Sequence, residues 1–228
     1  MSTKKTFYTE LCYVIGLVLL AFSAAIMKAA DLGVSMVVAP PYLLHLKLSE
    51  YLPFFSYGMA AYTFQALLLI AMIIVLRRFK LSYLFSFVSA VIYGFLLDGF
   101  GLIVDLIPMT ALPVRIVFFM LGALICALAI SFMFHTYVSP EVYELFVMEI
   151  SDKFGFEMHR VKLFYDYISC AVSVIMSFAF FGMWHFEGVK LGTIIYSLVN
   201  GYIIAMFSKF FEKHFEFKDA LKLRNFFK

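Results

Sequence analysis

The sequence predicts an all-α membrane protein with six transmembrane helices, arranged as two inverted repeats of three spans each, with a short interfacial or re-entrant helix after spans 1 and 4. Composition is the first observation behind this prediction. Hydrophobic residues make up 64% of the 228 residues and charged residues 14%, with a mean hydropathy of +0.96. The polar residues are too few to cover the surface of a water-soluble domain of this size. The chain is therefore expected to be an integral membrane protein.

The second observation is the number of long apolar segments. Six segments each hold about 20 predominantly apolar residues, the length that crosses a bilayer as a helix. They are Leu11–Ala30, Ser56–Leu76, Leu81–Val104, Leu112–Met133, Val161–Phe181 and Leu191–Phe211. Residues 1–228 are therefore expected to form a single membrane domain, with repeat one at about 1–110 and repeat two at about 111–228.

The third observation is a repeated order of elements, offset by 104 residues from Ser35 to Ser139. Each copy has an apolar span, a Val-Ser break, a short apolar stretch and two further spans. Because three spans are an odd number, the second copy is predicted to lie upside down in the bilayer, as in many secondary transporters.

The short stretches, 34–46 and 138–150, are too short to cross a membrane. The second is predicted to begin with Ser139 as N-cap, Pro140 at the first helical position and Glu141 in the first turn. Its acidic side chains favour a helix lying flat in the interface over one that dips into the membrane. These side chains are Glu141, Glu144 and Glu149.

The distribution of basic residues predicts the orientation, because positively charged loops stay in the cytoplasm. Of the 18 lysines and arginines, 14 fall on the side of the two termini and only Lys28, Lys47, Arg115 and Lys190 on the other. Both termini are therefore expected inside. The net charge of +3 is explained by topology, and no affinity for nucleic acid is inferred from it.

Two alternatives concern the N-terminal span and the cysteines. Lys4 and Lys5 before the first span, and small residues at its end, also resemble a cleaved signal peptide, although cleavage would destroy the symmetry between the halves. Cys12, Cys126 and Cys170 are odd in number and lie in or beside apolar spans, so they are expected to be small buried residues and neither disulfides nor metal ligands.

Asp98 is the first candidate functional residue, because a carboxylate inside a spanning helix is costly and is functional by default. Gly94, Asp98, Gly101 and Asp105 share one helical stripe. The alternative is that Asp98 lies close enough to the outer interface to be solvated.

Other polar residues within the spans complete the candidate substrate or ion pathway. Asp166 begins a serine-rich stripe, although it could simply pair with Lys162 and the serines could serve helix packing. Gln65, Tyr93 and Asn200 are buried polar groups that could converge with Asp98 and Asp166 between the repeats. Gly94 and Gly201 occupy matching mid-helix positions and are expected at tight helix contacts. The tail from Lys209 to Lys228 interleaves phenylalanine and lysine, which suits an interfacial helix.

The chain resembles the YczE/YyaS/YitT-like family of small bacterial six-span membrane proteins along essentially its whole length. The similarity is carried by Ala30-Asp31-Leu32-Gly33-Val34-Ser35, by Ser139-Pro140, by Gly94 through Asp98, by Asp166 and by Gly192-Thr193-Ile194-Ile195. Met36 and Tyr137 depart from the family pattern. The resemblance implies a multi-pass protein of the bacterial plasma membrane whose biochemical activity is largely undefined.

The expected function is a secondary transporter or permease for an unidentified small solute. The alternative is a non-transporting membrane subunit, such as the substrate-capturing component of a larger importer. An enzyme is not expected, because no catalytic motif is present and the histidines fall near the predicted membrane surfaces. No cofactor is expected. The expected partners are the lipid bilayer, a small molecule or ion, and other copies or membrane subunits.

Overall fold

The protein contains eight α-helices and two short β-strands over the part of the chain that the computed structural model describes, residues 5–183, 187–221 and 224. In chain order the elements are β1 Lys5–Tyr8, α1 Thr9–Ala30, α2 Ala39–Ser49, α3 Tyr57–Leu76, α4 Leu81–Val104, α5 Leu112–Met133, α6 Val142–Phe154, α7 Met158–Phe181, α8 Leu191–His214 and β2 Phe215–Lys218. The order long, short, long, long therefore occurs twice.

Six of these helices are long and apolar enough to cross a membrane, which confirms the predicted spans. They are α1, α3, α4, α5, α8 and the part of α7 from Arg160 to Phe181. Many large apolar side chains on their outer faces are exposed to the surroundings of the protein, among them Leu102, Ile175 and Tyr202. A surface of this kind requires lipid around it, so the chain is a membrane protein.

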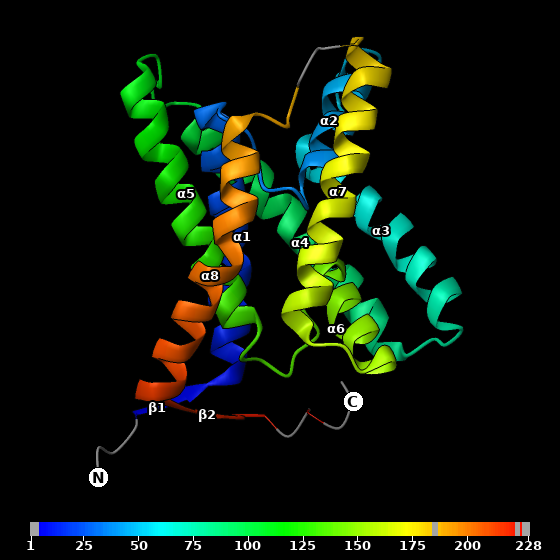
Figure 1. The fold of residues 1–228 in the computed structure, drawn as a ribbon, viewed down its shortest axis with the longest axis vertical. Coiled ribbons are helices and arrows are strands. Elements are labelled where there is room, and N and C mark those ends of the chain that lie inside the picture. The colour runs from blue at the N-terminus through cyan, green and yellow to red at the C-terminus, as the bar shows by residue number, and fades with distance from the viewer. Residues whose placement is uncertain (1–4, 184–186, 222–223, 225–228) are drawn as a thin grey trace.

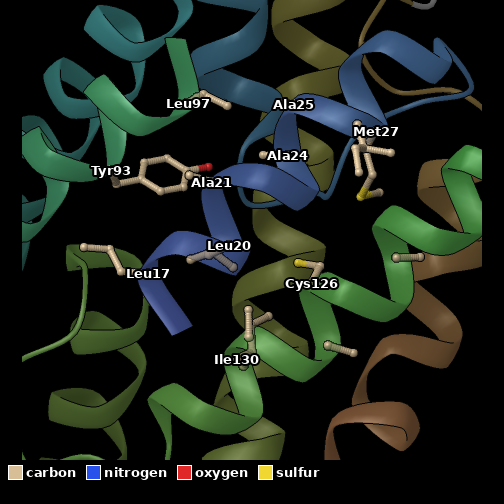
Figure 2. Close-up of a cluster of buried hydrophobic side chains, with 14 of the residues drawn as sticks. Leu17, Leu20, Ala21, Ala24, Ala25, Met27, Tyr93, Leu97, Cys126 and Ile130 are labelled. Atoms are coloured by element: carbon tan, nitrogen blue, oxygen red, sulfur yellow. The ribbon is translucent and has the colours of Figure 1, made fainter. Parts of the chain in front are cut away.

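Helix α1, the span with the largest buried share, packs along α4 and α5 (Figure 1). Figure 2 shows the contact, where Tyr93 of α4 reaches α1 beside Ala21, and Cys126 and Ile130 of α5 lie near Leu20. Small residues on α1, including Ala24 and Ala25, let its neighbours approach closely. Helix α5 also packs on α8, and α3 packs extensively on α4, whereas the contact between α7 and α8 is small.

The two short helices lie toward opposite ends of the molecule, α2 away from the β-strands and α6 nearer to them (Figure 1). Each packs against its own neighbour, α2 on α3 and α6 on α7, and also against a long helix of the other half, α2 on α7 and α6 on α3. Helix α2 begins with Pro40 and Pro41 in its first turn, where proline needs no amide donor.

Helix α6 corrects two of the predictions. It begins at Val142 with Glu141 as N-cap, so Ser139 is not the cap and Pro140 precedes the helix. Its three acids, Glu141, Glu144 and Glu149, are buried, with at most 7% of each residue exposed. Acids that marked a flat interfacial face would point to water or headgroups. Here they point into the protein, because partners on α3, on α7 and in the loop between α3 and α4 receive them.

The C-terminal tail also differs from the prediction. Instead of an interfacial helix, Phe215–Lys218 forms a strand that pairs in parallel with Lys5–Tyr8. The rings of Phe7, Phe217 and Phe132 pack together below the helices, which gives this small sheet an apolar anchor. Lys4, Phe226 and Phe227, which contributed to the predictions for the two ends, lie outside the described residues.

The two mid-helix glycines have different environments. A Cβ atom at Gly94 would lie 2.8 Å from the carbonyl oxygen of Gly58 and 3.0 Å from Cδ1 of Tyr62, so this glycine does permit a close contact between α4 and α3. Gly201 is exposed, and a Cβ there would meet nothing within 4 Å. The predicted tight contact at Gly201 is therefore wrong, because that face of α8 has no helix packed against it.

Candidate functional site

A small cavity, lined mostly by apolar side chains but also by two acids and a lysine, lies where the two halves of the chain meet. Its volume is about 20 Å³, room for about one water molecule. The lining comes from α1, α4, α5, the residues before α2, the start of α6, and α7. The residues are Leu20, Ser23, Ala24, Met27, Ser35, Val37, Val38, Tyr93, Cys126, Ile130, Glu141, Tyr143, Glu144 and Lys162.

Glu141 is the most deeply buried acid at this cavity, with no exposed surface. Its Oε2 accepts a hydrogen bond of 2.7 Å from Nε2 of Gln65, and the Oε1 of Gln65 accepts one of 2.9 Å from the amide of Val142. The Val142 amide thus orients the Gln65 side chain with its NH₂ group toward Glu141. Gln65 therefore ties α3 to the first turn of α6.

Glu144 stands one turn further along α6 and is 3% exposed. Lys162 on α7 lines the same cavity and forms an ion pair of 3.0 Å with Asp166. The positive charge of Lys162 also acts on Glu144. Two carboxylates on α6 and an ammonium–carboxylate pair on α7 therefore share one water-poor region of the protein.

Several oxygen atoms around the cavity have no hydrogen-bond partner among the described residues. They are Oε1 of Glu141, Oε2 of Glu144 and the hydroxyls of Tyr93 and Tyr143, all inaccessible to solvent. A buried polar atom without a partner costs about 1–3 kcal/mol. Four such atoms beside a cavity with room for about one water molecule make this region the candidate site.

The electrostatics of the two acids follow from their burial. Burial raises the pKa of Glu141 well above its ordinary value, the charge of Glu144 raises it further, and the hydrogen bond from Gln65 opposes the shift in part. Burial also raises the pKa of Glu144, and the charge of Lys162 offsets part of that rise. The site therefore favours the protonated form of Glu141, whereas the charge of Lys162 favours the ionised form of Glu144.

Two of the predicted site residues lie at this cavity and a third is connected to it. Tyr93 lines it and Gln65 holds Glu141, as just described. Asp166 does not line the cavity but forms an ion pair with Lys162, which does. The predicted alternative that Asp166 pairs with this lysine is therefore confirmed. Asn200 is buried on α8 with an unpartnered Oδ1 and is not part of the cavity lining.

Asp98 lies elsewhere and serves the start of α3. Its Oδ2 accepts a hydrogen bond of 2.6 Å from the hydroxyl of Ser56, and its Oδ1 accepts one of 2.8 Å from the amide of Gly58. The Ser56 hydroxyl in turn accepts from the amide of Met59. These bonds satisfy free amides at the helix N-terminus, where the helix dipole also favours a negative charge. The close approach at Gly94 brings the two helices near enough for this contact.

The residues that sequence reasoning missed are Glu141, Glu144 and Lys162. The sequence pattern assigns the two acids to an interfacial face, and it assigns Lys162 only a positive charge on the side of the termini and a possible pairing with Asp166. A usable signal was present, since Glu141 and Glu144 lie one turn apart within an otherwise apolar stretch. Sequence alone did not show that Gln65, 76 residues earlier, pairs with Glu141.

Ion pairs at the end of the molecule away from the β-strands join the two halves through Asp31 and hold α1 to the end of α4 through Asp105. Arg115 at the start of α5 donates to the carbonyl of Ala30 at 2.7 Å and to the carboxylate of Asp31 at 2.7 Å. Lys190 before α8 pairs with the same Asp31, and Lys28 pairs with Asp105 at 3.2 Å. Near the opposite end, Arg78 and Lys80 both pair with Glu149 of α6.

The fold and site define a class: a polytopic helical membrane protein with six spans and a buried, charged cavity between its halves. Within that class the chain belongs to a family of unknown function, DUF6198, whose model matches residues 7–209. No curated protein and no solved structure matches the chain.

Proposed function

We propose that the protein is a secondary transporter or permease for a small solute, with its binding site at the cavity beside Glu141, Glu144 and Lys162. The observation that carries the proposal is the set of buried charged groups with unpartnered oxygens between the two halves of the chain. Ionisable groups inside a membrane bundle are expensive and mark ion or substrate pathways. No enzymatic role is proposed.

The packing pattern supports an inverted repeat as the framework of this transporter. If α1 to α4 are matched with α5 to α8, the contact of α2 with α7 corresponds to that of α6 with α3. The contact of α1 with α4 likewise corresponds to that of α5 with α8. The opposite placement of α2 and α6 agrees with this relation (Figure 1). Sites of inverted-repeat transporters lie at the interface between the repeats.

The same contacts suggest which parts move. Helices α1, α4, α5 and α8 form one group and α2, α3, α6 and α7 another, and the cavity has lining residues from both. The groups are firmly joined between α3 and α4 but only weakly between α7 and α8. Rocking of one group against the other about the α3–α4 contact would expose the cavity alternately to the two sides. The ion pairs of Asp31 and Asp105 lie within the first group and would move with it, whereas those of Arg78 and Lys80 with Glu149 join the α3–α4 loop to α6 of the second group.

We also propose that the protein lies in a bacterial plasma membrane with both termini cytoplasmic, and that it is related to the YczE/YyaS/YitT-like family. Two motifs of that resemblance lie against each other in the fold. The amide of Gly192 donates to the carbonyl of Leu32 at 3.1 Å, and the Thr193 hydroxyl donates to the carbonyl of Val34 at 2.8 Å. Between them Gly33 has φ of +118° and lies so close to Thr193 that no side chain could be accommodated.

The experiment is uptake into proteoliposomes that contain only this protein. A thermal-shift screen of amines, amino acids, carboxylic acids and sugars selects the compounds that bind, and the radiolabelled hits are then tested for flux. We expect saturable uptake that Glu144→Gln abolishes, whereas Asp152→Asn, at an exposed acid of the same helix, retains it. Binding without flux in the wild-type protein would contradict transport and favour a substrate-capturing subunit.

A further inference from the structure

The acids Glu141 and Glu144 differ in the charge of their nearest partners. Both are buried at the same cavity, but Lys162 acts on Glu144, whereas the partner of Glu141 is the neutral amide of Gln65. Two neighbouring carboxylates in a region of low dielectric cannot both ionise cheaply, because their charges repel and neither is hydrated. One of the two must be neutralised.

Within the described part of the chain, the groups that surround the pair supply one positive charge, that of Lys162. From α7, Lys162, Asp166 and Tyr165 lie near it, and the lysine is already paired with the aspartate at 3.0 Å. From α4 comes Tyr93, from α1 Tyr13, from α5 Cys126 and from α8 Tyr196, and α6 itself adds Tyr143. Gln65 of α3 cannot titrate. With Glu141, Glu144 and Asp166 all ionised, three negative charges would face one positive charge.

We infer that Glu141 and Glu144 form a proton-binding site, in which Glu141 holds the proton and Glu144 remains ionised beside Lys162. The Oε1 of Glu141 has no hydrogen-bond partner and lies at the cavity, which has room for about one water molecule. Protonation at Oε1 makes this group a donor toward the cavity while Oε2 still accepts from Gln65. A proton is favoured over a metal cation, because the ammonium group of Lys162 repels a second fixed cation.

This inference depends on the proposed function only for what the proton is used for, namely coupling to solute movement. A solute that enters the cavity with a positive charge would replace the proton on Glu141, and a neutral solute would travel with it. In either case the protonation of Glu141 would change as the two groups of helices rock. The binding of the proton itself can be measured without any transport.

The test is infrared spectroscopy of the full chain purified in detergent, titrated from about pH 5 to pH 9. A protonated carboxylic acid has a C=O stretching band distinct from that of a carboxylate, and exposed acids are ionised at neutral pH. We expect the wild-type protein to retain this band at pH 7 and to lose it at higher pH. Glu141→Gln should abolish it, Glu144→Gln should keep it but move its disappearance to lower pH, and Asp152→Asn should leave it unchanged.

The result that overturns the inference is a wild-type protein without the band at pH 7, or a band that survives Glu141→Gln. Should Glu141→Gln fail to fold, the wild-type titration and the shift in Glu144→Gln still decide the matter. Replacing choline chloride by sodium chloride at pH 7 should have no effect. Loss of the band on adding Na⁺ would overturn the proton as occupant and make the pair a sodium site. Flux without the band refutes this inference alone, and the band without flux refutes only transport.

Discussion

The contact between α3 and α4 at Gly58 and Gly94 provides the sharpest test of the packing. In Gly94→Ala the new Cβ would lie 2.8 Å from the carbonyl oxygen of Gly58, a backbone atom that cannot rotate away. The helices must separate by several tenths of an ångström, and overpacking of this kind costs about 1–3 kcal/mol. Separation also stretches the 2.8 Å hydrogen bond from the Gly58 amide to the Asp98 carboxylate. A hydrogen bond to a charged group contributes about 1.5–3 kcal/mol to stability.

An opposing effect comes from the better helix propensity of alanine, about 1 kcal/mol. We therefore expect Gly94→Ala to lower the free energy of unfolding by about 1–3 kcal/mol, measured by circular dichroism during reversible SDS unfolding in mixed micelles. Gly201→Ala is the matched control, because its Cβ meets open space, and it should be neutral or stabilise by up to about 1 kcal/mol. Equal effects at both positions would show that the α3–α4 approach is not tight.

Three further predictions concern acids. Asp98→Asn should lower the free energy of unfolding by about 1–2 kcal/mol, since Ser56 and Gly58 donate to different carboxylate oxygens and the NH₂ group that replaces one of them cannot accept, and an unchanged melting temperature would contradict the capping role. At Glu149 burial raises the pKa, but the hydrogen bonds and charges of its cationic partners outweigh burial and hold it below the ordinary 4.5. That acid therefore stabilises the fold above about pH 4.5 and loses this contribution as the pH falls through its lowered pKa, so Glu149→Gln should flatten the acid limb of the stability curve. Glu141 has a raised pKa, so the unfolded chain releases its proton first and stability should fall as the pH rises above 4.5, until Glu141 ionises in the fold. Glu141→Gln should remove that slope in thermal melts from pH 5 to pH 9, and an unchanged slope would contradict the raised pKa.

The sequence predicted the spans well because hydrophobicity and length alone decide them. Each predicted span agrees with a helix to within a few residues, and both short helices were expected where they occur. The chemistry was harder to predict, because a helix pattern shows which side chains share a face but not which other helix receives that face. The sequence predicts Gln65 as a buried polar group of the pathway, but it predicts its partner Glu141 at the membrane interface.

The errors have the same origin. An acid-rich short helix looks the same in sequence whether its acids face headgroups or buried partners, and only the positions of Lys162, Gln65 and Lys80 distinguish the two cases. The sequence singles out Asp98 as the first candidate functional residue. Its partners, the first amides of α3, are backbone groups that no side-chain pattern reveals. The cost of a half-buried carboxylate within a span can be met by capping a helix as well as by binding a solute.

The sheet of β1 and β2 has a consequence for how the protein is made. Lys5 pairs with Phe215, and the amide of Leu221 donates to Glu10 at 2.8 Å across 211 positions of chain. During synthesis the first strand leaves the ribosome early and must wait without its partner until the last of the six spans has been inserted. Such long-range pairing is slow to form. Closure of this sheet is therefore a late event that reports completed insertion, and a chain stalled before α8 would leave an unpaired strand edge open to aggregation or degradation.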